Sequence, residues 1–246
     1  MSRITIVNQN PESVHWSDMA SCQYSIDAGV DIWRINIADN LKVIDDLSSV
    51  LSNDEIARAN RFFYTKDKNR HIVGHGAMRI ILGRYLNQSP SSIEFEYESN
   101  KKPFITNKIE IHFNLSHSGD WVLLAIANSP IGVDTELINP GFEYKDVMEG
   151  YFNPAEIGFI NEGKSAERFY LLWTRKEAQI KGTGKGLDEN IKLVPGLAGT
   201  YNIDLDVISS DFDWLISSFE LDEQHIASVA ADPLTREIRF WDVDFH

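Results

Sequence analysis

Apolar and polar residues alternate along several short segments of this chain, and that alternation predicts β-strands. The clearest single strand covers residues 30–37. Residues 111–127 predict a hairpin, in which two apolar runs flank the turn Ser116-His-Ser-Gly-Asp120. Further strands are expected at 93–98, 131–136, 200–207, 212–219, 225–231 and 236–242.

Helical spacing of apolar residues predicts the other elements. Residues 67–86 have the pattern of a long amphipathic helix, and Ser52-Asn-Asp-Glu55 is typical of a helix start. Two more helices are expected at 154–162 and 165–182. The glycine-rich run Gly182-Thr-Gly-Lys-Gly186 follows a helix, so it indicates a helix end rather than a phosphate-binding loop.

The order of these elements hints at a duplication. In each half of the chain a long helix is followed by a strand hairpin. We therefore expect an α+β fold of two similar α/β lobes, residues 1–130 and 131–246. A cleft between two lobes is a favoured place for a ligand, so we expect the active site there.

Composition narrows the classes of partner and compartment. The 246 residues carry a net charge of -14, which argues against general nucleic-acid binding. The single cysteine, Cys22, allows no internal disulfide and fits a reducing compartment. No apolar run reaches the roughly 18 residues of a membrane span, and no signal peptide is recognisable. We expect a cytoplasmic protein.

Two segments carry the candidate chemistry. Asp134 and Glu136 lie two residues apart on a predicted strand and should point from the same face. Trp173, Glu177 and Lys181 lie four residues apart on a predicted helix and should share one stripe. Three carboxylates and a lysine, if brought together, suit a divalent cation such as Mg²⁺ bound to a phosphate-rich ligand.

Each of these features also has a simpler interpretation. An Asp-x-Glu pair is commonly a solvated strand face, and a Glu/Lys pair is commonly an exposed helix pair of little energetic value. Trp173 is more typical of packing than of catalysis. His71 and His75 lie four apart on a helix, but no third zinc ligand is evident.

Three motifs together favour the chemical interpretation. Phe113-Asn-Leu-Ser-His-Ser-Gly119, Ile131-Gly-Val-Asp-Thr-Glu136 and Trp173-Thr-Arg-Lys-Glu-Ala-Gln-Ile-Lys181, in that order, resemble the 4'-phosphopantetheinyl transferases. The likeness is to the large, surfactin-synthetase-activating type, which is a monomer of two similar lobes. The resemblance implies that coenzyme A and Mg²⁺ bind in the cleft. A carrier-protein serine attacks the β-phosphate of coenzyme A, and adenosine 3',5'-bisphosphate leaves.

The resemblance also implies roles for individual residues. Asp134, Glu136 and Glu177 would hold the metal, and Lys181 would contact a phosphate oxygen. Glu177 is also a candidate general base, directly or through a metal-bound water, and the sequence does not separate this role from that of a ligand.

Coenzyme A would be bound by cations and by the hairpin turn. Ser116 and His117 are expected at its phosphates, as is Lys102 of the Lys101-Lys102-Pro103 segment. For the 3'-phosphate the family places cations near the start of the long helix, where Arg70 and Arg58 are the candidates.

The expected partner is an apo acyl or peptidyl carrier protein. Its docking surface is predicted at four aromatic residues that could equally be core: Phe142, Tyr151, Phe152 and Phe159. Carriers of fatty-acid, polyketide and nonribosomal-peptide synthesis all remain open, although the acidic charge mildly favours peptidyl carriers. The alternatives are a non-catalytic protein of the same fold that binds coenzyme A or a carrier, and a different metal-dependent phosphotransfer enzyme.

Overall fold

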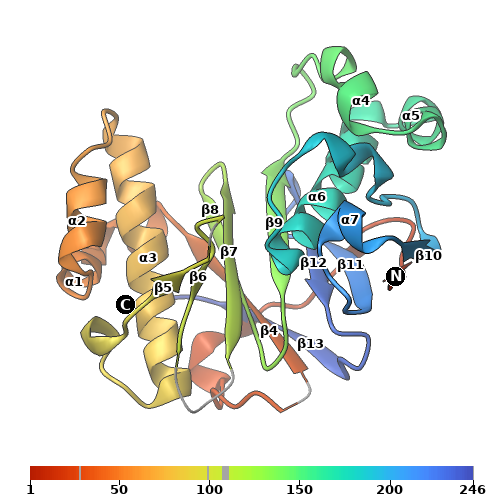
Figure 1. The fold of residues 1–246 in the computed structure, drawn as a ribbon. Coiled ribbons are helices and arrows are strands. Elements are labelled where there is room, and N and C mark those ends of the chain that lie inside the picture. Colours follow the sequence, from red (N-terminus) through yellow and green to blue (C-terminus); the bar gives the residue numbers. More distant parts are fainter. Residues whose placement is uncertain (28, 99, 107–110, 246) are drawn as a thin grey trace.

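Two β-sheets stand side by side at the centre of the molecule, and each has a long helix on its outer side (Figure 1). The structure, a computed structural model, describes residues 1–27, 29–98, 100–106 and 111–245. The first sheet has the strand order β10 (Gly199–Ile203), β1 (Ser2–Ile6), β11 (Trp214–Glu220), β12 (His225–Ala231) and β9 (Gly132–Leu137), with β2 (Glu12–Ser13) beside β11. The second has the order β3 (Ser17–Asp18), β13 (Glu237–Asp242), β4 (Gly29–Asn36), β8 (Trp121–Ala127) and β7 (His112–Ser118). A two-stranded ribbon pairs β5 (Glu96–Tyr97) with β6 (Pro103–Phe104).

Helices complete the two lobes. The α-helices are α1 (Ile44–Ser49), α2 (Asn53–Ala59), α3 (Thr65–Leu86), α4 (Lys145–Tyr151), α5 (Pro154–Asn161), α6 (Ser165–Thr183) and α7 (Leu205–Ile208). Short 3₁₀ turns are η1 (Met19–Ser21), η2 (Asp39–Val43), η3 (Pro90–Ser92) and η4 (Glu189–Leu193). The start of α2 is fixed by a capping box, in which Ser52 and Glu55 bond reciprocally to each other's backbone N–H.

The apolar core has a layered arrangement. Residues of α3 such as Val73 and Ile81 pack on one face of the second sheet, and Ala178 and Ile180 of α6 pack on one face of the first. The remaining faces of the two sheets share a third cluster, which joins Ile32 of β4 to Val133 of β9 and its neighbours. The layers therefore run α3, sheet, sheet, α6, and the predicted α+β fold with two lobes is confirmed.

The two ends of the chain cross between the lobes. Strand β1, at the N-terminus, pairs with β10 and β11 in the first sheet, whereas β13, near the C-terminus, pairs with β4 in the second. The division at residues 130 and 131 stays a prediction about domains. The first sheet includes β1 and β2 from the N-terminal end of the chain, and the second includes β13 from the C-terminal end.

The strand expected at 93–98 is wrong for most of its length, since only residues 96 and 97 form β5. The cause is Arg79 of α3, whose guanidinium donates to the carbonyl oxygens of Pro90, at 3.0 Å, and Ile93, at 2.9 Å. A side chain thus takes up backbone acceptors that a neighbouring strand would otherwise use. The strand expected at 200–207 likewise ends at Ile203, and Leu205–Ile208 forms α7.

Helix α6 lies unusually close to strand β9, and Gly132 is what permits it. A Cβ atom at this position would lie 2.1 Å from the carbonyl oxygen of Ala178 and 2.3 Å from the backbone nitrogen of Gly182. Both contacts are far shorter than atoms tolerate, so only glycine fits. On the helix side, a Cβ at Gly182 would lie 2.9 Å from the Trp214 ring.

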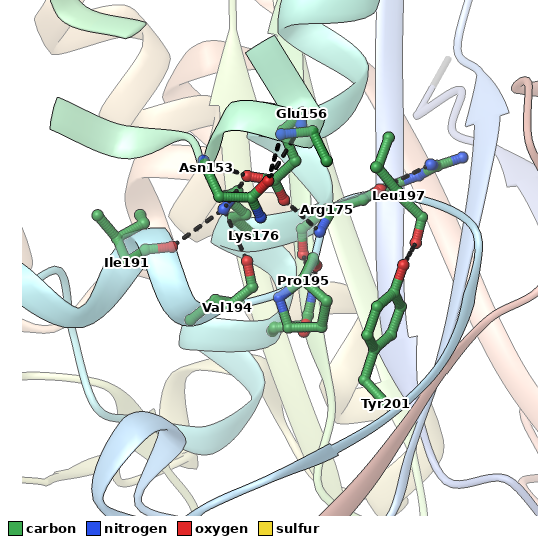
Figure 2. A network of polar contacts seen from close by, with 12 residues as sticks. Asn153, Glu156, Arg175, Lys176, Ile191, Val194, Pro195, Leu197 and Tyr201 are labelled. Atoms are coloured by element: carbon green, nitrogen blue, oxygen red, sulfur yellow. Dashed lines mark hydrogen bonds and ion pairs between the residues drawn. The ribbon is translucent and has the colours of Figure 1, made fainter. Parts of the chain in front are cut away.

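On its other side, α6 is fastened by charged groups that are entirely buried (Figure 2). Lys176 is 0% exposed and forms a 2.9 Å ion pair with Glu156 of α5. Its ammonium also donates to the carbonyls of Ile191, at 3.1 Å, and Val194, at 2.7 Å. Glu156 in turn accepts the N–H of Gly196 at 2.8 Å. Each charge therefore has several partners, as a buried charge requires.

Arg175, the preceding residue, fastens the helix to the first sheet. Its guanidinium donates to Ser218 of β11 at 2.9 Å and to the carbonyl of Gly196 at 2.8 Å.

Among the residues described, no helix is both long and apolar enough to span a membrane.

Substituting Gly132 with alanine should force α6 away from β9 and lower the free energy of unfolding by about 1–3 kcal/mol or more. Urea unfolding measures this. The matched control is Gly158→Ala in α5, where an added Cβ meets nothing within 4 Å and should be neutral or stabilise by up to about 1 kcal/mol. A Gly132→Ala protein as stable as wild type would contradict the close contact.

The Lys176–Glu156 pair should behave as one unit. Lys176→Met leaves the buried Glu156 carboxylate without its ion-pair partner and should lower the unfolding free energy by about 3–5 kcal/mol. The double variant Lys176→Met/Glu156→Gln should lose less than the sum of the two single losses, by about 1 kcal/mol or more. Additive losses in the double-mutant cycle would mean that the two side chains do not interact.

Candidate functional site

The candidate site lies where the edge strands of the two sheets meet. Strand β7 is the edge of one sheet and β9 is the edge of the other, and α6 crosses behind β9. A cavity of about 280 Å³ opens at this junction. It is lined by residues from all three elements: Leu115, Ser116, His117, Asp134, Glu136, Trp173, Glu177 and Lys181. The structure thus brings together Ser116, His117 and the four residues that the two metal motifs supplied.

Asp134, Lys181 and Ser116 form a tight triangle in this cavity. The Lys181 ammonium lies 2.6 Å from Asp134 Oδ1 and 2.9 Å from Ser116 Oγ, and the Ser116 hydroxyl donates to the same Oδ1 at 2.9 Å. Burial raises the pKa of Asp134, and Lys181 opposes that rise. Asp134 Oδ2 is buried and has no hydrogen-bond partner in the described part of the chain. This carboxylate therefore keeps one acceptor oxygen unused.

Glu136 and Glu177 crowd further negative charge around Asp134. Burial, followed by the Asp134 charge, raises the pKa of Glu136. Burial, followed by the charges of Asp134 and Glu136, raises the pKa of Glu177 to about 7, although Lys181 acts in the opposite direction. Burial disfavours the ionised form of all three carboxyl groups, and the neighbouring carboxylates add to this for Glu136 and Glu177.

Metal binding by these three carboxylates stays a prediction. Among the described residues, no three His, Cys, Asp or Glu side chains stand in a ready-made metal-binding group. The donor set nevertheless consists of oxygens alone, and one of them is buried without a partner. Both features fit a hard divalent cation better than zinc, which prefers nitrogen and sulfur ligands.

A second cavity, of about 400 Å³, adjoins the first and shares Leu115, His117, Glu177 and Lys181 with it. Its other walls come mainly from the N-terminal lobe, including the predicted residues Arg58 and Lys102, and also from the end of α6 and the segment after it, including Leu187. Arg70 is not among the residues that line it, and its guanidinium is paired with Asp67 at 2.7 Å. Burial and the nearby Arg70 charge lower the pKa of His117, so this imidazole is neutral at neutral pH.

Lys102 has a different environment from the one expected of a phosphate ligand. Its ammonium donates to the carbonyls of Lys181, at 2.7 Å, Gly182, at 3.0 Å, and Ile131, at 3.1 Å. An ammonium has three donors, and here all three are used. Burial lowers the pKa of Lys102 to about 8. The structure therefore shows Lys102 closing the C-terminal end of α6, and its contact with coenzyme A stays a prediction.

His75 was not singled out for ligand binding, yet it lines the second cavity. Its ring packs against that of His71 in a tilted arrangement, with centroids 4.1 Å apart and an interplanar angle of 43°, and its Nδ1 faces Glu55 Oε1 at 3.2 Å. The helical spacing of the two histidines was the signal in the sequence. In the structure that spacing places the two rings in contact, and both are hydrogen-bonded to Glu55.

The predicted aromatic docking surface is partly wrong. Phe152 is 1% exposed and packs on Phe169, so it belongs to the core. Tyr151 is half-buried against Trp173, and Phe159 lies beneath the Arg168 guanidinium. Phe142, 43% exposed, is the member of the set that stands out on the surface.

Comparison with known proteins identifies the family. Residues 40–129 match the model of the N-terminal domain of 4'-phosphopantetheinyl transferase, and residues 130–230 match the model of the 4'-phosphopantetheinyl transferase superfamily. The 4'-phosphopantetheinyl transferase HetI of Nostoc sp. is 31% identical over 219 residues, which cover 86% of this chain and 91% of that protein.

Two Bacillus subtilis proteins give the same result. A 4'-phosphopantetheinyl transferase is 27% identical over 76% of this chain and 84% of its own length. The 4'-phosphopantetheinyl transferase Sfp is 32% identical over 56% of this chain and 62% of its own length. A solved holo-(acyl-carrier-protein) synthase from Bacillus anthracis covers 42% of this chain and 96% of its own at 18% identity and a TM-score of 0.34, a likeness too slight to assign a fold or a function. On the family models and the Nostoc relative, this chain belongs to the 4'-phosphopantetheinyl transferases and is an enzyme of that superfamily.

Proposed function

We propose that this enzyme transfers the 4'-phosphopantetheine group of coenzyme A to a serine of an apo carrier protein, in a reaction that depends on Mg²⁺. The serine oxygen forms a bond to the β-phosphorus, the bond from that phosphorus to the leaving phosphate breaks, and adenosine 3',5'-bisphosphate departs. The observation that carries the proposal is the meeting of two cavities at Glu177 and Lys181.

The second cavity suits the donor. Its walls combine cationic or imidazole side chains, such as Arg58 and His75, with apolar groups, such as Met78 and Leu187. Coenzyme A needs this combination, since it carries a pyrophosphate and a 3'-phosphate beside an aromatic base. The phosphates would point towards Lys181, Ser116 and His117, where the two cavities join. Lys181 and the Ser116 hydroxyl provide a cation and a donor at that point.

The acidic cavity suits a divalent cation held by Asp134, Glu136 and Glu177. When bound, the cation supplies positive charge beside the pyrophosphate, where negative charge develops during transfer. The three carboxylates are poorly solvated, and burial raises the pKa of each; for Glu136 and Glu177, repulsion by the neighbouring carboxylates adds to the rise. The repulsion is relieved when positive charge enters the cavity.

Glu177 is suited to remove the proton of the attacking serine. A general base is most effective when its pKa lies near the working pH, and in the site without a cation burial raises the pKa of Glu177 to about 7. The residue lines both cavities, so it stands between the proposed donor site and the acidic group. The roles of ligand and base are compatible with the same side chain.

The proposal extends to the partner and the compartment. The acceptor is a carrier protein whose serine-bearing helix docks beside the cleft, with Phe142 as the exposed apolar contact. The net charge of -14 disfavours nucleic acid and mildly favours a peptidyl over an acidic acyl carrier. The enzyme would act as a monomer in the cytoplasm, where its single cysteine stays reduced.

Intact-mass spectrometry tests the reaction directly. Wild-type enzyme incubated with coenzyme A, Mg²⁺ and an apo peptidyl or acyl carrier should add one phosphopantetheine group, and EDTA should block the gain. Glu177→Gln should reduce the rate by about 10²-fold or more. Glu167→Gln, on the exposed first turn of the same helix, should leave the rate unchanged. Binding of coenzyme A without mass gain on any carrier would favour the non-catalytic alternative.

The raised pKa of Glu177 also predicts a dependence of stability on pH in the absence of divalent cations. Its folded-state pKa, about 7, lies above the ordinary value of 4.5. The stability that this group contributes is present below pH 4.5 and is lost as the pH rises through 7. Relative to wild type, Glu177→Gln should therefore gain about 1–3 kcal/mol of unfolding free energy between pH 5 and pH 8. Urea unfolding in EDTA at both pH values measures this. A difference in unfolding free energy between Glu177→Gln and wild type that is the same at pH 5 and pH 8 would contradict the prediction.

A further inference from the structure

Three side chains of β7 point across the junction between the lobes. Asn114, Ser116 and Ser118 are spaced by two residues, so they share one face of the strand. Among the described residues, β7 pairs through its backbone with β8, and β9 pairs with β12. The two edge strands come together without a backbone ladder between them. Side chains must therefore make the polar contacts of this junction.

These contacts follow one another along the strands. Asn114 Oδ1 accepts the N–H of Val133 at 2.8 Å. Ser116 donates to Asp134 at 2.9 Å, and Ser118 donates to Glu136 Oε2 at 2.9 Å. Successive members of this set on β7 thus contact residues progressively further along β9. We call Asn114, Ser116 and Ser118 the polar seam.

The Ser118 hydroxyl has a fixed direction because it is bonded on both sides, to the β9 backbone and to Glu136. The oxygen accepts the backbone N–H of Leu137 at 2.9 Å, and the hydroxyl proton is donated to Glu136. The Trp173 side chain, from α6, lines the same cavity and acts to lower the pKa of this carboxyl group. Glu136 is therefore held from β7 by a hydrogen bond and faces Trp173 of α6 across the cavity.

Without such contacts, Glu136 would have freedom to turn away. It is half-exposed and lies next to the last residue of β9, whereas Asp134 is buried and already bonded to Lys181. A glutamate side chain has three rotatable bonds and loses considerable entropy when fixed in one position. A hydrogen bond from a rigid neighbouring strand offsets part of that loss before any ligand arrives.

We propose that Ser118 is a positioning residue, which holds the Glu136 carboxylate towards Asp134 and Glu177 so that a divalent cation finds its oxygen ligands prearranged. The inference rests on the proposed function, because it assumes that these carboxylates bind a cation. It assigns a purpose to the second serine of the Ser116-His-Ser118 sequence, to which sequence analysis gave none.

Ser118→Ala tests this role with little risk to the fold. The Leu137 N–H that it leaves behind belongs to an exposed residue, so water can satisfy it. Ser118→Thr keeps the hydroxyl and should restore the wild-type behaviour. Ser91→Ala is the matched control, since it removes an exposed hydroxyl whose bond is to Ser89, away from the site.

The main readout is the affinity for Mn²⁺ in the presence of coenzyme A, measured by the electron paramagnetic resonance of unbound Mn²⁺. Two further measurements are made on each variant: its melting temperature, and its affinity for coenzyme A in EDTA. Ser118→Ala should bind Mn²⁺ about tenfold or more weakly, as expected when a group that orients a metal ligand is lost. Its melting temperature and its affinity for coenzyme A without metal should match those of Ser91→Ala.

Three outcomes would overturn the inference, and they are distinguishable. Equal Mn²⁺ affinities of wild type and Ser118→Ala would remove the positioning role and leave the proposed function standing. A wild-type enzyme that binds coenzyme A but no Mn²⁺ would refute the cation-binding part of the proposed function, and the positioning role with it. A weakened Ser118→Ala that Ser118→Thr does not restore would also count against the hydroxyl.

Discussion

The close contact between α6 and β9 at Gly132 is the constraint on which the site depends. Two elements that carry charged side chains approach until a single methyl group would no longer fit between them. This contact is what brings the Lys181 ammonium to within 2.6 Å of Asp134. The opposite side of the helix is held by Arg175 and Lys176, which are buried and bonded to carbonyls and to Glu156. One helix therefore has two polar faces, one that anchors it and one that serves the cavity.

Side-chain hydrogen bonds join the two edge strands at the junction between the lobes, whereas neighbouring strands within a sheet are joined by backbone hydrogen bonds. Strands β7 and β9 are edges, and edge strands expose unpaired backbone groups that proteins must manage. Here the seam of Asn114, Ser116 and Ser118 covers that edge and bonds to both strand carboxylates. The same hydrogen bonds thus join the lobes and arrange the acidic group. The ends of the chain reinforce the junction, since β1 and β13 cross to opposite lobes.

Local periodicity carried most of what the sequence could predict. Alternation along 131–136 placed Asp134 and Glu136 on one face, and helical spacing placed Glu177 and Lys181 on one stripe; all four line the same cavity. The exchange of end strands could not be predicted, because nothing local in residues 2–6 indicates a partner more than 200 residues away. Gly132 was overlooked because a missing side chain gives no chemical signal. The predicted roles of Lys102 at a phosphate and of Phe152 on the docking surface came from a motif and from residue type. Both side chains are instead enclosed by segments distant in sequence, which local patterns do not reveal.

The account's central claim is that Asp134, Glu136 and Glu177 together bind one divalent cation beside the coenzyme A phosphates. Anomalous diffraction at the manganese edge, from crystals grown with Mn²⁺ and coenzyme A, tests it most directly. The account predicts one strong peak within coordination distance of all three carboxylates and of a phosphate oxygen. Coenzyme A seen in the cleft with no manganese peak at these residues, or with the peak at other ligands, would contradict it.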